Sequence, residues 1–258
     1  MELELEGHVV LVAGGSTGLG YALAQQLVRE GAYVGLLARD AGRLAAAARG
    51  LREAGGEVLD LAGDVRRVED LARFVARASD RWGRIDGIVN NAGELAAGAF
   101  AEHDDETWRQ DLSLKLMGAV RLTRLALPAL RKRAGAVVNT LAISGKAPDA
   151  QTTPTSVSRA AGLALTKALS RELAGDGVRV NAVMVGVVES PQLERRAAAA
   201  GITAPEYYER MVLDCAIPLG RVGHPQEYAD LACFLLSARA AYLTGTAINL
   251  DGGLCPVV

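Results

Sequence analysis

Short runs of hydrophobic residues alternate with longer amphipathic segments along nearly the whole chain. Short runs rich in Val, Leu and Ile are typical of strands that are buried on both faces. They predict strands at residues 9–12, 33–38, 57–61, 85–90, 136–141, 178–185 and 246–250. The segments between them carry apolar residues at helical spacing and predict helices at residues 19–30, 43–53, 68–82, 107–132, 154–174, 194–213 and 225–237.

This regular alternation of strands and helices, joined by short connections, predicts an α/β fold. The strands should form a parallel, doubly wound sheet of about seven strands with right-handed crossovers. No linker, internal repeat or low-complexity stretch divides the chain. We therefore expect a single domain over residues 1–258.

The first predicted strand runs straight into a turn that contains Gly14, Gly18 and Gly20. Residues without a Cβ let the chain turn sharply, let a ligand approach the backbone, and let the next helix pack closely. The free N–H groups and the dipole at the start of that helix suit a pyrophosphate. Because the glycines lie between a strand and a helix, they predict a Rossmann-type dinucleotide site more strongly than an ordinary tight turn.

Composition and charge exclude several classes of function. The net charge is −2 and the Lys and Arg residues are scattered, which argues against a nucleic-acid surface. No apolar run approaches the roughly 18–20 residues that cross a bilayer, and the acidic N-terminus lacks a signal-peptide core. Cys215, Cys233 and Cys255 show no metal-ligand spacing, so we expect no metal. These features predict a cytoplasmic protein that acts on a small molecule.

Five motifs together make the chain similar to the short-chain dehydrogenase/reductase family over essentially its whole length. They are Gly14-x-x-x-Gly18-x-Gly20, Asp64-Val65, Asn90-Asn91-Ala92-Gly93, Arg179-Val180-Asn181-Ala182 with Gly186, and Gly245-Thr246 followed by Asp251-Gly252-Gly253. The resemblance implies NAD(P) at the C-terminal edge of the sheet, and a homotetramer or homodimer. The helical segments 112–130 and 160–173 are apolar on more than one face, which favours a subunit interface over deep packing against the sheet.

The resemblance also implies which residues contact the cofactor. The expected set covers the pyrophosphate, the adenosine, both riboses and the nicotinamide carboxamide: Gly14, Ser16, Thr17, Gly18, Leu19, Gly20, Asp64, Val65, Asn91, Ala92, Gly93, Arg159, Val188 and Ser190. At the end of the second strand an acidic residue would bind a ribose 2′-hydroxyl, whereas Arg suits a 2′-phosphate. Ala38 holds the acidic position and Arg39 follows it, so we expect NADP(H) rather than NAD(H). The alternative is that Arg39 is a solvated loop charge beside Asp40.

The four positions that carry the family's usual catalytic Asn, Ser, Tyr and Lys hold other residues here. By alignment they are Lys115, Ala142, Thr155 and Arg159. The chain has no tyrosine between Tyr33 and Tyr207 that a shifted alignment could use. A Thr hydroxyl has too high a pKa to be a good proton donor near neutrality.

A different set of residues is left for chemistry: Glu94, Lys115, Thr155 and Arg159. Buried charges are normally paired, so we expect Glu94, Lys115 and Arg159 to form one network. In the functional interpretation Lys115 or Arg159 binds an anionic or enolate-like substrate oxygen, and Lys115 or Glu94 transfers a proton. In the alternative, the network only replaces the lost hydrogen bonds.

Residues 190–214, broken by Gly201 and Pro205, correspond to the family's substrate lid and carry Tyr207 and Tyr208. Three functions stay open from the sequence. The first is an NADP(H)-dependent oxidoreductase with a reorganised proton-transfer site, acting on a carbonyl or alcohol that is anionic or enolisable. The second is a dinucleotide-binding protein without catalysis. The third is a non-redox isomerase or lyase.

Overall fold

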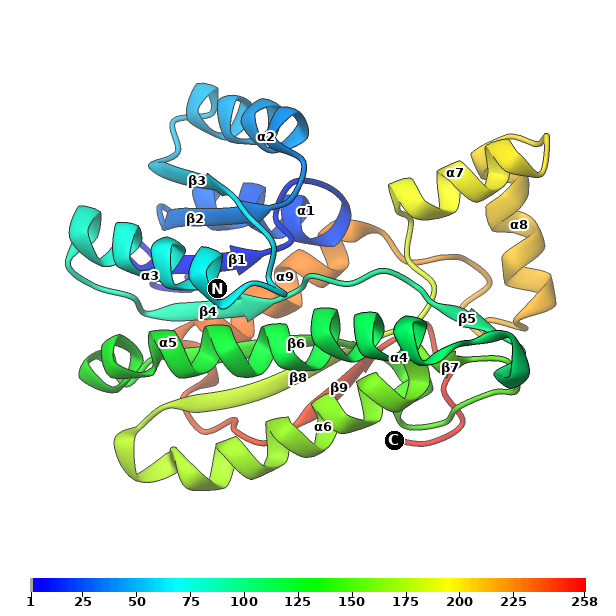
Figure 1. Cartoon of the computed structure of the whole chain (residues 1–258). Helices are drawn as coiled ribbons and strands as arrows, with labels where there is room; N and C mark the ends of the chain where they lie inside the picture. The colour runs from blue at the N-terminus through cyan, green and yellow to red at the C-terminus, as the bar shows by residue number, and fades with distance from the viewer. Residues whose placement is uncertain (1) are drawn as a thin grey trace.

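Seven parallel strands form one sheet in the computed structural model, which describes residues 2–258 (Figure 1). The strands are β1 (Val9–Ala13), β2 (Tyr33–Ala38), β3 (Val58–Ala62), β4 (Gly87–Asn90), β6 (Ala136–Ala142), β8 (Arg179–Val185) and β9 (Ala247–Leu250). Their spatial order is β3-β2-β1-β4-β6-β8-β9, so the chain builds outward from β1 in both directions. A crevice at this switch between β1 and β4 is where such sheets bind ligands. The predicted fold class is confirmed.

Helices cover both faces of the sheet. They are α1 (Gly18–Arg29), α2 (Ala41–Glu53), α3 (Val68–Trp82), α4 (Asp105–Leu112), α5 (Gly118–Arg133), α6 (Thr155–Glu172), α7 (Pro191–Ala199), α8 (Ala204–Asp214) and α9 (Pro225–Leu236). Short 3₁₀ turns lie at η1 (Phe100–Glu102), η3 (Ile143–Gly145), η4 (Ala174–Asp176) and η5 (Ala238–Ala240). Helices α1, α2 and α9 pack on one face, and α3, α5 and α6 on the other.

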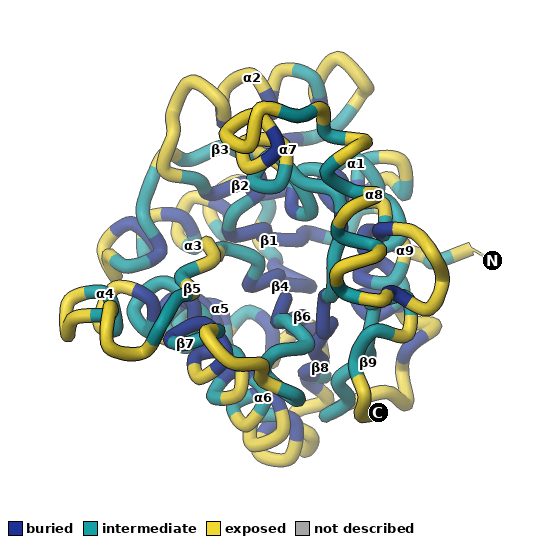
Figure 2. The backbone as a smooth tube through the Cα atoms, turned by 90° about the vertical axis from the view of Figure 1, so that its right-hand side faces the viewer, coloured by how far each residue is buried: buried dark blue, intermediate teal, exposed yellow. Residues whose placement is uncertain are grey.

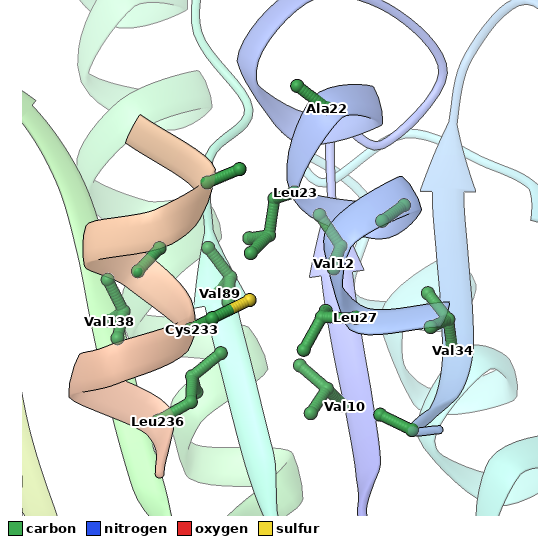
Figure 3. Packing of buried hydrophobic residues seen from close by; sticks show 14 of the residues in the cluster. Val10, Val12, Ala22, Leu23, Leu27, Val34, Val89, Val138, Cys233 and Leu236 are labelled. Carbon is green, nitrogen blue, oxygen red and sulfur yellow. The ribbon is translucent and has the colours of Figure 1, made fainter. Parts of the chain in front are cut away.

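The strands are hydrophobic without alternation because both of their faces are covered. Every residue of β1 is buried, as the dark central strands in Figure 2 show. On one face, Leu23 and Leu27 of α1 meet Val12 and Val89 of the sheet (Figure 3). Cys233 of α9 lies in the same cluster, and burial raises the pKa of its thiol, so this cysteine is a core residue.

The predicted single helix over residues 107–132 is wrong in one respect. It consists of α4 and α5 joined by the π-helical turn η2 (Ser113–Met117). A π turn adds one residue to a helical turn and changes the direction in which its side chains point. The central residue of η2 is Lys115, which the turn leaves buried.

Two very short strands were not predicted. The strands β5 (Ala97–Gly98) and β7 (Thr153–Pro154) pair antiparallel beside the carboxyl ends of the main sheet. The predicted helix 194–213 is two helices, α7 and α8, which turn at Gly201 with φ +70°. Within residues 2–258, every helix is too short or too polar to cross a bilayer.

A buried carboxylate, that of Asp86, links several elements at the amino ends of the strands. Asp86 precedes β4 and accepts hydrogen bonds from the backbone N–H of Val9 (2.9 Å), from Arg84 (2.7 Å) and from Arg133 (3.1 Å). Burial alone would raise the pKa of Asp86, but these donors outweigh burial and lower it. This cluster ties β1, β4 and α5 together far along the strands from the glycine-rich turn.

Candidate cofactor and active site

A cleft of about 760 Å³ opens at the carboxyl ends of β1, β2, β4 and β6. Its lining comes from the glycine-rich turn, the ends of these strands, the segment after β8, and helix α7. Among the residues expected at a cofactor, all but Gly20 line this cleft. Their contact with a cofactor stays a prediction, but the fold brings them to one surface.

The glycine-rich turn has the shape of a backbone cradle. Gly14 has φ +80°, and a Cβ placed there would lie 2.9 Å from the Cα of Ala92. A Cβ on Gly20 would lie only 2.1 Å from the carbonyl oxygen of Gly14. Gly20 therefore packs directly against the turn and does not line the cleft itself. The side chain of Asn91 donates to the same Gly14 oxygen at 2.9 Å. This cradle fits a dinucleotide pyrophosphate at the start of α1.

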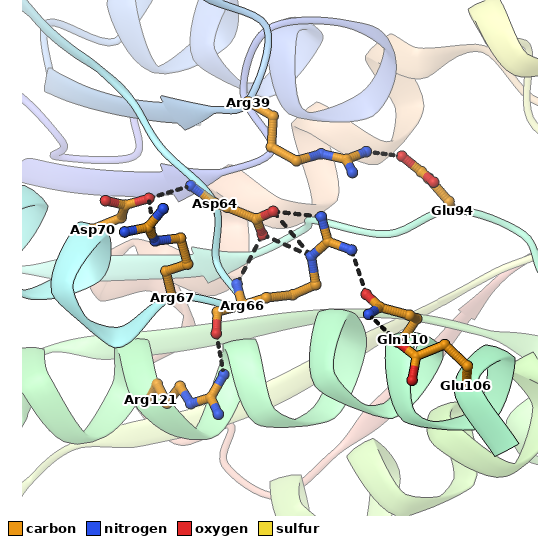
Figure 4. Close-up of polar contacts among 9 residues, drawn as sticks. All are labelled: Arg39, Asp64, Arg66, Arg67, Asp70, Glu94, Glu106, Gln110 and Arg121. Carbon is orange, nitrogen blue, oxygen red and sulfur yellow. Dashed lines mark hydrogen bonds and ion pairs between the residues drawn. The ribbon is translucent and has the colours of Figure 1, made fainter.

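Charged side chains gather at the end of the cleft formed by β2 and β3 (Figure 4). Arg39, which follows β2, forms an ion pair with Glu94. Asp64, which follows β3, accepts hydrogen bonds from Arg66. Burial would raise the pKa of Asp64, but the bonds from Arg66 outweigh burial and lower it. This end of the cleft therefore carries both basic and acidic groups.

The prediction that Glu94, Lys115 and Arg159 form one network is wrong. Glu94 is exposed and pairs with Arg39, because the chain after β4 carries it toward the end of β2. Lys115 pairs instead with Asp111, and both side chains are at most 2% exposed. No carboxylate of residues 2–258 is within ion-pair distance of Arg159. The one predicted network is thus two separate ion pairs and one guanidinium without an ion-pair partner.

Lys115 and Asp111 form a buried pair behind the cleft wall. Lys115 Nζ also donates to Thr155 Oγ1 at 2.6 Å. Burial lowers the pKa of Lys115 to about 8, although its hydrogen bond to Asp111 opposes that shift, and the nearby charge of Arg159 adds to it. An ammonium group with this pKa is charged at neutral pH and still exchanges its proton readily.

Sequence reasoning missed Asp111. It lies four residues before Lys115, the spacing at which opposite charges on a helix become neighbours. That spacing was a usable signal, since an acidic residue at i−4 is the simplest local partner for a lysine predicted to be buried. One oxygen of Asp111, Oδ2, is buried without a hydrogen-bond partner among residues 2–258.

Thr155 lines the cleft at the position of the family's Tyr, and its hydroxyl makes several bonds. It donates to the carbonyl oxygen of Ala96 at 2.7 Å and accepts from the Ala96 N–H at 3.0 Å. It also accepts from Lys115. The hydroxyl therefore fastens the segment before β5 to the start of α6, and lies between the lysine and the cleft.

Arg159 follows Thr155 by one helical turn and also lines the cleft. Its Nη1 donates to the carbonyl oxygen of Thr140 at 2.8 Å, while Nε is buried without a hydrogen-bond partner among residues 2–258. Burial lowers the pKa of Arg159 to about 10, so the guanidinium keeps its charge at neutral pH. A Cβ on Gly93 would lie 2.6 Å from Nη2, so any larger residue there would displace the guanidinium from this position.

Other residues lie differently around the cleft. Ala142, at the position of the usual serine, lines it, whereas the nearest hydroxyl, that of Ser144 in the turn η3, does not. Tyr207 and Tyr208 are on α8 but do not line the cleft; Met211, on the same helix, does. The wall on the α7 side includes Ser190, Arg195 and Arg196.

The fold and the glycine cradle together define a dinucleotide-binding α/β protein. Comparison with known proteins gives the family. A family model described as "Enoyl-(Acyl carrier protein) reductase" matches residues 13–255. A "Putative ketoacyl reductase" of Streptomyces coelicolor is 35% identical over 256 residues, covering 96% of this chain and 97% of that protein. The chain therefore belongs to the short-chain dehydrogenase/reductase family of oxidoreductases.

Two solved structures are similar over nearly their whole length. L-Sorbose reductase from Gluconobacter frateurii, complexed with NADPH and L-sorbose, has a TM-score of 0.94 at 32% identity, with 100% of both chains covered. A short chain oxidoreductase from Pseudomonas aeruginosa PAO1, NADPH-bound and described as containing an atypical catalytic center, has a TM-score of 0.92 at 35% identity. That alignment covers 97% of this chain and 98% of the other.

Proposed function

We propose that this chain is an NADP(H)-dependent oxidoreductase that reduces a carbonyl group with a proton-transfer site different from the family's usual one. The observation that carries the proposal is the hydrogen bond from Lys115 to Thr155 at the wall of a cleft shaped for a dinucleotide. The NADPH-bound relatives support the choice of cofactor. The residues of the glycine cradle would hold the pyrophosphate, and Arg39 would hold the 2′-phosphate.

In this proposal Lys115 is the proton source and Thr155 is the relay. A bound nicotinamide would supply the hydride. The Thr155 hydroxyl turns from the Ala96 oxygen toward the substrate oxygen and gives it a proton, while Lys115 passes a proton to Thr155 Oγ1. Because the threonine oxygen is reprotonated as it donates, it never carries a full negative charge, which removes the objection from its high pKa. Lys115 ends as a neutral amine and regains a proton from water in the cleft, through Thr155, once the product has left.

Arg159 gives the proposal its substrate class. A buried guanidinium that lacks a carboxylate partner favours an anionic ligand, since it presents N–H donors in a fixed planar fork. We infer that the substrate is a carbonyl compound whose carboxylate or enolate-like oxygen lies against Arg159. The lid helices α7 and α8 would close over it.

The test measures NADPH oxidation with a panel of oxo acids and their methyl esters. We expect turnover with the acids, weaker turnover with the esters, and a loss of this preference in Arg159→Met. The double variant Asp111→Leu/Lys115→Met should lose about 10²- to 10⁴-fold in rate, whereas Lys132→Met, at an exposed lysine, should not. NADPH binding without turnover of any carbonyl compound would contradict the proposal.

NADPH binding without turnover would instead favour a dinucleotide-binding protein without catalysis. One observation supports this second function. The Thr155 hydroxyl donates its one proton to the Ala96 oxygen and accepts from the Ala96 N–H, as a purely structural group would. We also propose that helices α5 and α6 form a subunit interface, because Met117, directly before α5, and Val157, in the first turn of α6, are exposed apolar side chains. Molar mass in solution by light scattering tests this, and a monomer would contradict it.

A further inference from the structure

Three arginine–carboxylate pairs lie at the adenosine end of the cleft, and one differs from the others. Arg43 pairs with Asp40 and Arg66 with Asp64, which are three and two positions away in the chain. Arg39 pairs with Glu94, which is 55 positions away. Figure 4 shows the side chain of Arg39 extending from the end of β2 to meet Glu94 on the segment after β4. This pair joins two separate parts of the cleft wall.

The Arg39–Glu94 pair is accessible and weak. The two side chains are 47% and 64% exposed, and both residues line the cleft. Exposed ion pairs stabilise proteins little, because water screens the charges and two long side chains lose freedom. Within residues 2–258, Glu94 is the one ion-pair partner of Arg39. A stronger anion that enters the cleft can therefore replace it.

We propose that Glu94 is a specificity-determining residue that occupies Arg39 in the free protein and is displaced by the 2′-phosphate of NADP(H). This inference rests on the proposed function, since it assumes that NADP(H) binds at Arg39. A phosphate monoester carries about −1.5 to −2 charges and three strong acceptor oxygens, against one charge on a carboxylate. The phosphate therefore displaces the Glu94 carboxylate from Arg39. NAD(H) has no such phosphate and leaves the pair closed.

The exchange can take place without moving the active site. Glu94 lies two residues before Ala96, whose N–H and carbonyl oxygen are both bonded to Thr155. That anchor holds the chain entering β5 while the Glu94 side chain swings away. The cost of breaking the ion pair is subtracted from the NADP(H) affinity alone. Glu94 thus keeps NADP(H) binding weaker than the cradle would allow.

The test is calorimetric titration of NADPH and NADH into the wild-type protein, Glu94→Gln and a matched control. The control is Glu4→Gln, which removes the same charge from an exposed pair with Arg239, with side chains 44% and 54% exposed, away from the cleft. We expect Glu94→Gln to bind NADPH about two- to five-fold more tightly, the range for an exposed ion pair. NADH affinity should not change in either variant. The gain should shrink as salt rises.

Each other outcome overturns a distinct claim. Equal NADPH affinity in the wild-type protein and Glu94→Gln would overturn the competition while leaving the cofactor site intact. Equal tightening for NADPH and NADH would also overturn it, because Glu94 would then repel either cofactor by charge alone. If the wild-type protein bound neither cofactor, the proposed function itself would fail, and this result is visible without any variant.

Discussion

The two halves of the cleft are built by different means. The half that would hold the pyrophosphate is shaped by backbone: Gly14 adopts φ +80°, and Gly20 leaves no space for a Cβ. The half at the catalytic positions is shaped by side chains, because Lys115, Asp111 and Thr155 bind one another in a buried cluster. Backbone shape can be kept by a few glycines, whereas side-chain chemistry changes with every substitution. Binding and turnover should therefore be separable in this protein.

The largest expected effect comes from breaking the buried pair in the catalytic half. Lys115→Met should lower the free energy of unfolding by about 3–5 kcal/mol, because it leaves the Asp111 carboxylate buried without an ion-pair partner. The double variant Asp111→Leu/Lys115→Met should recover most of this loss, since apolar replacement of a buried pair is often neutral. Urea unfolding of both variants checks this. Equal stability of Lys115→Met and the wild-type protein would show that the pair is not buried in solution.

The next largest effect is expected from a substitution in the half of the cleft that would hold the pyrophosphate. Gly20→Ala places a methyl group 2.1 Å from the Gly14 oxygen, so the turn must open. We expect NADPH affinity to fall by at least about 100-fold, equivalent to about 2.8 kcal/mol. The control is Gly175→Ala, whose new Cβ has no heavy atom within 4 Å. Unchanged NADPH affinity in Gly20→Ala would mean that the cofactor does not use the cradle.

The buried carboxylate of Asp86 lies outside the cleft, so its loss should affect stability and leave cofactor binding unchanged. Asp86→Asn should cost about 1–3 kcal/mol of stability at neutral pH, because hydrogen bonds from charged donors are weakened. Folding lowers the pKa of Asp86. Its ionised carboxylate therefore stabilises the folded protein fully above the pKa of an unfolded Asp, about 3.9, and this stabilisation is lost as the pH falls further. The difference in melting temperature from the wild-type protein should therefore shrink in acid. NADPH affinity of the folded variant should not change, unlike that of Gly20→Ala.

The smallest effect concerns the protonation of Lys115. Its pKa of about 8 means that the proton for reduction is present below that value and is lost above it. The rate of carbonyl reduction at saturating NADPH should fall by about tenfold per pH unit once the pH exceeds 8. Alcohol oxidation should rise over the same range, because it needs the neutral amine. A flat profile from pH 6 to pH 9.5 would remove Lys115 from proton transfer.

The fold was accessible from the sequence because its strands carry short runs rich in hydrophobic residues, of which β1 is the clearest. The two-residue strands β5 and β7 were not accessible, since two residues cannot show a period of two. The π turn at Lys115 was missed for a related reason. One extra residue in a turn shifts the apolar spacing too little to separate it from a continuous helix.

The candidate site was predictable where it depends on local geometry. The glycine-rich turn lies between a strand and a helix, and the structure places its lining residues in one cleft. The partner of Glu94 was not predictable, because it depends on how the segments after β2 and β4 converge. The charge of Glu94 is attracted equally by any nearby cation, so the sequence could not distinguish Arg39 from Lys115.

Whether the two halves of the cleft act independently is decided by titration of NADPH and NADH into the wild-type protein and Asp111→Leu/Lys115→Met. We expect both proteins to bind NADPH with the same micromolar affinity, and to bind NADH more weakly, because the binding half of the cleft is independent of the catalytic half. Loss of NADPH binding in a folded double variant would contradict that independence. Failure of the wild-type protein to bind either cofactor would contradict the whole account.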